Sequence, residues 1–457
     1  MADTREETRA STGGTAPGTT QDVVDAVREI RLEHAPADAV EVAKHCLLDW
    51  LGVTLAGTGE DLAVILRKQL VRDGDGQATV VGTRASTDPS TAALVNGATS
   101  HALDYDDTHT TMSGHPTVPV MPAVLALAER DGRSGADLLT ALVAGIEAEC
   151  LVGSLVAPGH YARGWHATGT IGTFGAAAAA ATLLDLDRTS WLHAFGLAGT
   201  QAAGLKDVFG TMAKPLHAGK AAANGLLAGV LAGAGFTSST DILESSTGFA
   251  ATYADPVRDV VVDGPTWAIR RTLFKYHASC YLTHGVIEST ARLRAGEGLT
   301  GDDVATVELH VSPGVLDVCN IEDPRTGLEA KFSLRACSAM ALLGTDTADL
   351  SSFSDAAAQS PQLHDLIDRV VVITDRGESP TAGTVRVLTR DGRERDARTD
   401  MSVPADDLSL QWSRLSDKFM ALATPVLGHE RAVALRSMVA EVDQLPSVRD
   451  LAEATRP

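Results

Sequence analysis

The sequence has few basic residues for its size. Its 38 Lys and Arg stand against 59 Asp and Glu, and the formal net charge is −21. The field of such a surface repels polyphosphates and anionic lipid headgroups, which argues against nucleic-acid binding and membrane association. A site for a small anion must then gather its own Lys, Arg and His side chains. Local clusters of basic residues are therefore informative in this chain.

Cysteine is also scarce, and several familiar catalytic motifs are missing. The five cysteines form no C-x-x-C pair, so neither a disulfide framework nor a zinc ribbon is indicated, and a reducing cytoplasm is the expected location. There is no G-x-S-x-G nucleophile elbow, no H-E-x-x-H, and no dinucleotide fingerprint between a strand and a helix. Nothing therefore supports a serine hydrolase, a zinc site of the metalloprotease type or hydride transfer.

Long apolar runs are absent as well. The longest stretches, roughly residues 171–184 and 221–236, fall short of the ~20 residues that span a bilayer and consist mainly of Ala and Gly. Small side chains let helix axes approach closely, so these stretches predict buried helices at the centre of a bundle. Residues 1–20 carry early acids and no apolar core, and we expect a disordered tail there rather than a signal peptide or anchor.

The periodicity of the sequence changes twice along the chain. Helical spacing dominates from about residue 20 to 270 and returns from about residue 405. Between them, Val304–Ser312, Val370–Thr374 and Thr384–Thr389 alternate as strands do, and Glu329–Leu343 predicts a helix. With 457 residues, the chain is long enough for two domains. We therefore expect a mostly α protein, in which a large all-helical domain of residues 21–270 plus 405–457 carries an inserted, smaller α+β lid domain of residues 271–404. The cleft between them is the expected ligand site.

The densest group of polar residues lies between two predicted helices, Ser90–Leu103 and Val120–Arg130. It reads His101-Ala-Leu-Asp104-Tyr-Asp106-Asp107-Thr108-His109 and continues with Gly114-His115-Pro116. Asp, Thr and Pro in such positions also cap helices. Imidazole and carboxylate groups are also ligands of zinc and of hard metal ions. Capping, metal binding and catalysis all remain open for this cluster from its residues alone.

Three further clusters place basic residues in front of predicted helices. They are Arg163-Gly-Trp-His166, Lys214-Pro-Leu-His217-Ala-Gly-Lys220, and Lys275-Tyr-His277-Ala-Ser-Cys280-Tyr-Leu-Thr-His284. A helix N-terminus favours a bound anion, although a histidine there is often structural. The Gly-Lys pair lacks the spacing of a P-loop, and the Cys–His spacing does not establish a thiolate dyad. Removal of a proton next to a carboxylate gives a dianionic state that needs a base and several cations, and these clusters offer both.

These clusters resemble the motifs of the MmgE/PrpD family. The resemblance rests on NGATSHALDYDDTH with GHPTVPVMPAVLALAE, on GWHATGTIGTFGAAAAAA, on FGTMAKPLHAGKAAANG, on KYHASCYLTHG and on TGLEAKFSL, in family order from about residue 20 to 450. It implies a helical domain from both chain ends, an α+β lid domain and an active site in the crevice between them. It also implies a homodimer that uses no cofactor and no metal.

The resemblance also assigns residues. The family's DxDDT motif corresponds to Asp104 and Thr108, its HP motif to His115, the histidine of its glycine-rich helix to His166, and its KPxH lysine to Lys214. We expect His115 or His166 to move the proton and Asp104 to orient a histidine or act as base. The residues expected to bind the substrate are Arg163, His217, Lys220, Lys275, Cys280 and His284.

The family includes 2-methylcitrate dehydratase, cis-aconitate decarboxylase and iminodisuccinate epimerase. The resemblance thus implies a lyase for a small di- or tricarboxylic acid, with dehydration of a 2-methylcitrate-like hydroxy acid expected first and epimerisation second. The decarboxylases carry His at the position of Cys280 and Tyr near Val318, which argues against decarboxylation. The dehydratases carry a longer DxxDTW…GHPS segment than the HTTMSGHP found here, which argues against 2-methylcitrate itself. A binding protein without activity stays open, because family does not fix function.

Overall fold

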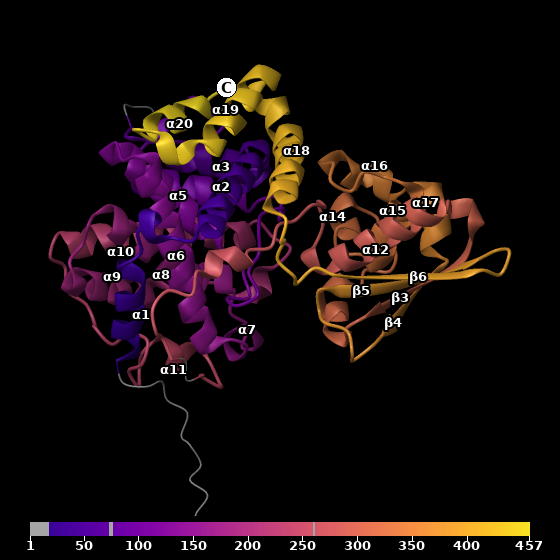
Figure 1. Ribbon diagram of the computed structural model, residues 1–457, viewed down its shortest axis with the longest axis horizontal. Helices are drawn as coiled ribbons and strands as arrows, with labels where there is room; N and C mark the ends of the chain where they lie inside the picture. Colours follow the sequence, from indigo (N-terminus) through magenta and orange to yellow (C-terminus); the bar gives the residue numbers. More distant parts are fainter. Residues whose placement is uncertain (1–17, 73–75, 259–260) are drawn as a thin grey trace, which may run out of the picture.

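The computed structural model describes residues 18–72, 76–258 and 261–457, and most of them are helical (Figure 1). The first part of the chain forms α1 (Thr19–Arg28), α2 (Ala37–Gly57), α3 (Asp61–Leu70), α4 (Pro89–Ser100), α5 (Thr117–Asp131), α6 (Gly135–Val156), α7 (Gly159–Ala162), α8 (Ala167–Leu183), α9 (Arg188–Gln201), α10 (Ala213–Gly233) and α11 (Phe249–Tyr253), with a short hairpin of β1 (Ala78–Thr79) and β2 (Ser86–Thr87). The chain ends in α18 (Leu408–Leu427), α19 (His429–Ala440) and α20 (Arg449–Ala454).

The central helix of this part is α8, which packs against α5, α6, α9 and α10. Its run of alanines is fully buried. Close packing depends on glycines of α10, because a Cβ at Gly225 or Gly229 would lie 2.5 or 2.6 Å from the Cβ of Ala176 or Ala180. The small residues therefore bring α8 and α10 into backbone contact, as the sequence predicts.

The two ends of the chain share one core. Helix α18 packs along α2, and Leu415 and Phe419 are buried in the same hydrophobic cluster as Leu47 and Leu51. In Figure 1 the yellow C-terminal helices lie over the indigo α2 and α3. The helical part is therefore built from both ends of the chain.

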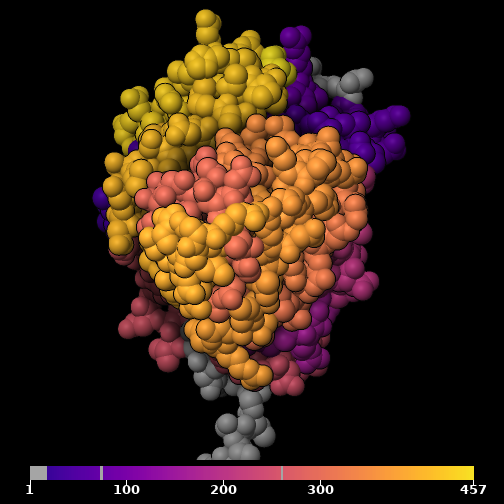
Figure 2. Space-filling model, turned by 90° about the vertical axis from the view of Figure 1, so that its right-hand side faces the viewer, coloured from indigo at the N-terminus to yellow at the C-terminus, as the bar shows by residue number. Residues whose placement is uncertain are grey.

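The middle of the chain forms an α+β part with a second hydrophobic cluster. Its elements are α12 (Tyr281–Glu297), β3 (Val304–Val311), α13 (Leu316–Cys319), α14 (Gly327–Ala330), α15 (Leu334–Leu343), α16 (Asp355–Ala358), α17 (Pro361–Ile367), β4 (Val370–Thr374), β5 (Ala382–Thr389) and β6 (Glu394–Asp400). The sheet order is β4-β3-β5-β6, with β3 and β4 parallel and the other pairs antiparallel. Helix α12 packs on β5 and β6, and α15 packs on α12. Figure 2 shows this orange part in front of the helical part, below the yellow C-terminal helices.

Some predicted boundaries are wrong. The helix predicted over Glu329–Leu343 is divided into α14 and α15, because Ser333 caps α15 by accepting the N–H of Ala336 at 3.2 Å. Strand β6 follows the turn at Asp391-Gly392 but was not predicted, since its sequence ERDARTD lacks apolar alternation. It pairs with β5 as the charged edge of the sheet.

The N-terminal tail and the apolar runs also differ from expectation. Residues 1–17 of the expected tail lie outside the described residues, but α1 begins at Thr19, and Thr20 is buried with its N–H 3.0 Å from Oε2 of Glu244. Helix α6 is long and apolar enough to cross a membrane by composition alone. However, 89% of its most apolar window is buried within the protein, as in a core helix.

Candidate active site

A cavity of about 250 Å³ lies where the helical part meets the α+β part. The helical part contributes Asp104, Thr108, His109, Thr110, Ser113, Gly114, His115, Tyr161, His166, Phe209 and Lys214, and the other wall consists of Lys275, Cys280, Tyr281, Leu282, Val318, Phe332 and Thr381. Both parts of the chain are therefore needed to form the cavity.

Helix N-termini surround this cavity. Among the described helices, α5, α8, α10 and α12 each begin beside a residue that lines it, namely His115, His166, Lys214 and Cys280. The N-cap residues of these four helices make no capping hydrogen bond, although the first N–H of α5 donates to Asp107 and that of α10 donates to Thr211. The positive end of the helix dipole and unpaired N–H groups favour a bound anion. The backbone thus adds to the positive potential of the side chains.

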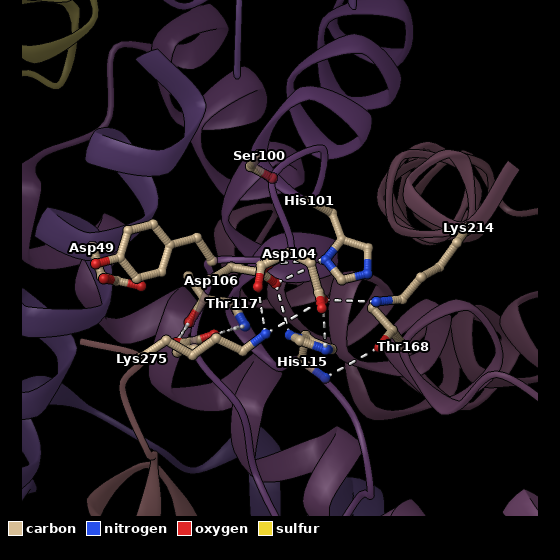
Figure 3. A network of polar contacts seen from close by, with 12 residues as sticks. Asp49, Ser100, His101, Asp104, Asp106, His115, Thr117, Thr168, Lys214 and Lys275 are labelled. Atoms are coloured by element: carbon tan, nitrogen blue, oxygen red, sulfur yellow. Dashed lines mark hydrogen bonds and ion pairs between the residues drawn. The ribbon is translucent and has the colours of Figure 1, made fainter. Parts of the chain in front are cut away.

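Asp104 lies between two lysines at the floor of the cavity (Figure 3). Nζ of Lys214 donates to its Oδ1 at 2.7 Å, and Nζ of Lys275 lies 3.4 Å from the same oxygen and also donates to the backbone carbonyl of Asp104. Burial acts to raise the pKa of Asp104, but the two ammonium groups outweigh it and hold that pKa well below its usual range. A carboxylate with so low a pKa is a weak base. Its position therefore fits orientation of its neighbours rather than the role of base.

Asp106 joins two histidines behind Asp104. Nδ1 of His101 donates to both carboxylate oxygens of Asp106 at 3.0 Å, and Nδ1 of His115 lies 2.9 Å from Oδ2 as an ion-pair contact. Nε2 of His115 is thereby left on the side of Asp104, 3.7 Å from its Oδ1. Burial is the main cause that lowers the pKa of His101 to about 4, so His101 is neutral near pH 7.

The backbone fixes this arrangement from two sides. The N–H of His115 donates to the hydroxyl of Thr168 at 3.1 Å, which ties the loop to the start of α8. Thr108 pairs with Leu273 through two backbone hydrogen bonds of 2.7 and 2.8 Å, and this pairing brings Lys275 to Asp104. Asp104 itself has a φ of 51°, in the left-handed region that few non-glycine residues adopt, although Asp and Asn tolerate it best. The loop conformation that presents Asp104 is therefore strained and specific.

His166 and His217 form a second pair of imidazoles. Their Nδ1 atoms are 3.0 Å apart, and the ring of His166 stacks on that of His101 with centroids 5.9 Å apart. Burial, followed by the neighbouring His101 and Lys214, holds the pKa of His166 well below its usual range. His166 is therefore a neutral group at the cavity wall, able to donate or accept a single hydrogen bond.

A metal ion is poorly suited to this group of residues. His101, Asp104, Asp106 and His115 each offer a ligand atom, and these atoms lie within 4.8 Å of one another. Such donors suit zinc or a hard cation. However, Oδ1 of Asp104 already contacts the ammonium groups of Lys214 and Lys275, which would repel a cation placed there. The charges present favour an anionic ligand instead.

Comparison with known proteins identifies the family. The models of the MmgE/PrpD N-terminal domain and the MmgE/PrpD C-terminal domain match residues 21–258 and 277–444. The chain belongs to the MmgE/PrpD family. It is similar to the cis-aconitate decarboxylases of Mus musculus (27% identical; 96% of this chain and 92% of the relative), Homo sapiens (28%; 93% and 92%) and Aspergillus terreus (26%; 95% and 95%).

The structure brings together most of the residues that the MmgE/PrpD resemblance selects. Asp104, Thr108, His115, His166, Lys214, Lys275 and Cys280 all line the cavity. The hydroxyl of Thr108 is buried and finds no hydrogen-bond partner among the described residues. His217 does not line the cavity but contacts His166 from behind. The structure thus places these residues in or directly behind one cavity.

Three residues that the sequence predicts to bind the substrate do not line this cavity. Arg163 is exposed at the end of α7, and Lys220 is exposed on α10. Lys220 follows Lys214 by six residues, which turns it to another face of the helix. His284 is fully buried in the first turn of α12, with its Nε2 3.4 Å from the carbonyl of Ser279. None of these three residues is part of the cavity wall described above.

Sequence reasoning missed two sets of supporting residues. His101 and Asp106 stand in the polar motif but are not among the predicted site residues. Lys418 of α18 is also absent from the prediction, yet its Nζ donates to Oδ1 of Asp49 at 2.6 Å and to the carbonyls of Tyr105 and Lys275 at 2.7 and 2.9 Å. Its signal in the sequence is a lysine on the apolar face of an amphipathic helix, where a buried partner is required. Lys418 thus ties the C-terminal helix to both cavity-forming segments.

Proposed function

We propose that this protein is a cofactor-independent enzyme that moves a proton at the carbon next to a carboxylate of a small di- or tricarboxylic acid. Within this class we favour the loss of water from a hydroxy acid similar to 2-methylcitrate. The observation that carries the proposal is the pairing of Lys214 and Lys275 around Asp104, next to a histidine held by Asp106. This pairing provides an anion site and a proton-transfer group in one cavity.

The charge balance supports binding of a carboxylate. Two ammonium groups face the Asp104 carboxylate at the floor of the cavity, while the Asp106 carboxylate behind it is turned to His101 and His115. The N-termini of α5, α8, α10 and α12 add partial positive charges around it. In a strongly acidic protein, this local potential draws a small anion to the cavity. The substrate carboxylate would replace part of the contact that Asp104 makes with the lysines.

The histidine contacts support proton transfer at the adjacent carbon. Nε2 of His115 takes the proton, and the imidazolium that forms is stabilised by the carboxylates of Asp106 and Asp104. The electron pair left on carbon is delocalised into the substrate carboxylate as an enediolate, whose charge Lys214 and Lys275 stabilise. Departure of a hydroxyl group from the next carbon then gives a conjugated acid.

The size and lining of the cavity favour a compact substrate with an apolar portion. A volume of about 250 Å³ lies below the usual range for drug-sized ligands. Phe209, Leu282, Val318 and Phe332 contribute apolar surface beside the charged groups. A small acid with methyl or methylene groups matches this combination.

Decarboxylation is the second candidate, because the relatives named above are cis-aconitate decarboxylases. Cys280 and Val318, for which the family resemblance implies a histidine and a tyrosine in those enzymes, both line the cavity. The difference therefore lies where it would alter the reaction, and this supports the elimination of water over the loss of carbon dioxide. Epimerisation would use the same proton abstraction but would form no C=C bond in the product.

The test is a screen of di- and tricarboxylic acids by proton NMR in deuterated water. Dehydration predicts new vinyl signals together with ultraviolet absorbance from a conjugated acid. Decarboxylation predicts loss of a carboxylate with carbon dioxide release, and epimerisation predicts exchange of the α-hydrogen alone. If no acid shows exchange, elimination or decarboxylation, the proposal is wrong. Full activity of His115→Ala and Lys214→Ala variants would reject the assigned site.

A further inference from the structure

The proposed elimination needs a group that gives a proton to the leaving hydroxyl, and the imidazolium of His115 is stabilised in its protonated form by Asp106 and Asp104. The lysines are engaged with Asp104. The cavity wall that belongs to the α+β part carries Cys280, a partly exposed thiol, whereas Cys46, Cys150, Cys319 and Cys337 are buried. Cys280 is thus a titratable group that the mechanism above leaves unused.

Cys280 is held in place by its backbone. It is the N-cap residue of α12, a helix of 17 residues. Its N–H donates to the carbonyl of Lys331 at 3.0 Å, and its carbonyl accepts the N–H of Thr283 at 2.9 Å. The side chain therefore stands at the positive end of a long helix and in the cavity at once. Such a position stabilises the thiolate that remains after a proton is given away.

The neighbours of Cys280 act in the same direction. The hydrogen-bonding thiol of Cys319 is the largest cause that lowers the pKa of Cys280; burial opposes it, and Lys275 and the N–H of Leu282 add to the lowering. The other titratable or charged groups that face it are Asp104, Lys214, Tyr161 and Cys337. Asp104 alone is anionic, and its charge is matched by the two lysines. The surroundings make this thiol a better acid than an ordinary cysteine.

We propose that Cys280 is the acid that protonates the departing hydroxyl group in the reaction that His115 begins. Nε2 of His115 takes the proton from the α-carbon, and the C–H electron pair enters the enediolate; that pair then forms the C=C bond as the C–O bond breaks. The Sγ–H of Cys280 gives its proton to the leaving oxygen, which departs as water. An imidazolium and a thiolate remain, and proton exchange with solvent restores both. This assignment rests on the proposed dehydration and gives that reaction its second proton-transfer group.

The first experiment separates the two proton transfers. For Cys280→Ala we expect the rate of elimination, followed by ultraviolet absorbance, to fall by about 10²-fold or more. Exchange of the α-hydrogen in deuterated water, which needs only His115, is expected to stay within a few fold of the wild-type rate. Cys150→Ala is the matched control, because this cysteine is buried on α6 and does not line the cavity. Circular dichroism of each variant checks the fold.

The second experiment measures the thiol directly. Cys280 is the accessible cysteine of the native protein, so the pH dependence of its alkylation by iodoacetamide reports its pKa. An acid must be protonated, and kcat is therefore expected to fall as pH rises through this same value. That alkaline limb should vanish in Cys280→Ala, and Cys280→His, which again supplies an acid, should restore part of the elimination rate.

The outcomes distinguish this assignment from the proposed function. If the wild type shows neither exchange nor elimination with any acid, both are overturned. If the wild type eliminates water and Cys280→Ala does so with the same rate and pH profile, only the role of Cys280 falls. Loss of exchange together with elimination in Cys280→Ala would also overturn it, because the thiol would then act in the first proton transfer.

Discussion

The carboxylate of Asp106 lies 2.9 Å from Nδ1 of His115, and this contact decides which nitrogen of the ring can meet a substrate. With Nδ1 held toward a buried carboxylate, Nε2 is free on the cavity side. The same carboxylate accepts a hydrogen bond from His101, so its second oxygen is not available to solvent. Asp106 therefore orients the ring of His115 through an ion-pair contact, without touching the ligand.

The first prediction concerns Asp106→Asn. The amide keeps the size of the side chain but carries no charge, so it does not stabilise the imidazolium that forms when His115 takes a proton. We expect kcat for α-hydrogen exchange to fall by about 10²-fold or more, with a smaller change in KM. Asp107→Asn is the control, because Asp107 contacts Thr117 rather than a histidine. Equal kinetics of the two variants would argue against a positioning role for Asp106.

The second prediction compares two lysines of α10. Lys214→Ala removes the ammonium group that contacts Asp104 at 2.7 Å, and we expect KM for a carboxylic acid substrate to rise by about 10-fold or more. Lys220→Ala removes an exposed lysine six residues further along the helix and is expected to leave KM unchanged. Steady-state kinetics at low salt provide the comparison. A similar rise in both variants would indicate a general effect of surface charge instead of a carboxylate site.

These lysines also show how far the sequence can predict the site. Lysine and histidine in front of a small-residue helix mark the correct segment, because the cation excess is unusual in an acidic protein. Choosing among Lys214, His217 and Lys220 requires the rotation of α10 about its axis. That rotation is set by contacts of α10 with α4 and α8, which are distant in the sequence. The sequence alone therefore selects the helix but not all of its functional residues.

The fold, like the site, can be predicted from the sequence only in part. Periodicity identifies the buried helices and three strands, since their burial follows the apolar pattern. Strand β6 and the break at Ser333 depend on an exposed edge and on a single capping hydroxyl, and neither changes the apolar pattern of the sequence. The ion pair of Lys418 on α18 and Asp49 on α2 joins two residues that are 369 positions apart in the sequence. Such long-range pairing becomes visible only when the helices are packed.

The third prediction concerns that ion pair. Lys418→Met leaves the buried carboxylate of Asp49 and the carbonyls of Tyr105 and Lys275 without their donor. We expect the free energy of unfolding to fall by about 3–5 kcal/mol, measured by urea denaturation. Arg188→Met is the control, because Arg188 pairs with Asp25 at the surface, where both side chains are exposed to solvent. It is expected to cost about 1 kcal/mol or less.

A second measurement tests whether the ion pair of Lys418 and Asp49 also affects substrate binding in the cavity. Because Lys418 binds the carbonyl of Lys275, its loss should also displace the ammonium group of Lys275 from Asp104. We expect Lys418→Met to raise KM at a temperature where the variant is still folded, and Arg188→Met to leave KM unaltered. Loss of stability without any change in KM would show that Lys418 supports the fold alone.

The fourth prediction uses the pH dependence of stability. Burial, together with the neighbouring Asp49 carboxylate, raises the pKa of Asp107 to about 8, compared with 3.8 for an unperturbed Asp. Between these two values the native protein keeps a proton that the unfolded chain releases. The retained proton of Asp107 therefore stabilises the native protein fully below about pH 4. This contribution to the free energy of unfolding declines by about 1.4 kcal/mol for each pH unit until about pH 8.

Asp107→Asn separates this titration from the rest of the protein. The amide resembles the protonated acid: its oxygen can accept the N–H of Thr117, and its NH₂ group can donate to the Thr117 hydroxyl. Since the amide does not titrate, the stability of the variant relative to wild type should improve steadily as pH rises from about 4 to about 8 and then level off. Urea midpoints measured across this range test the slope. If the urea midpoints of the two proteins change with pH in the same way, Asp107 is ionised in the native state. The proton assigned to it would then lie on another of the buried carboxyl groups behind the cavity.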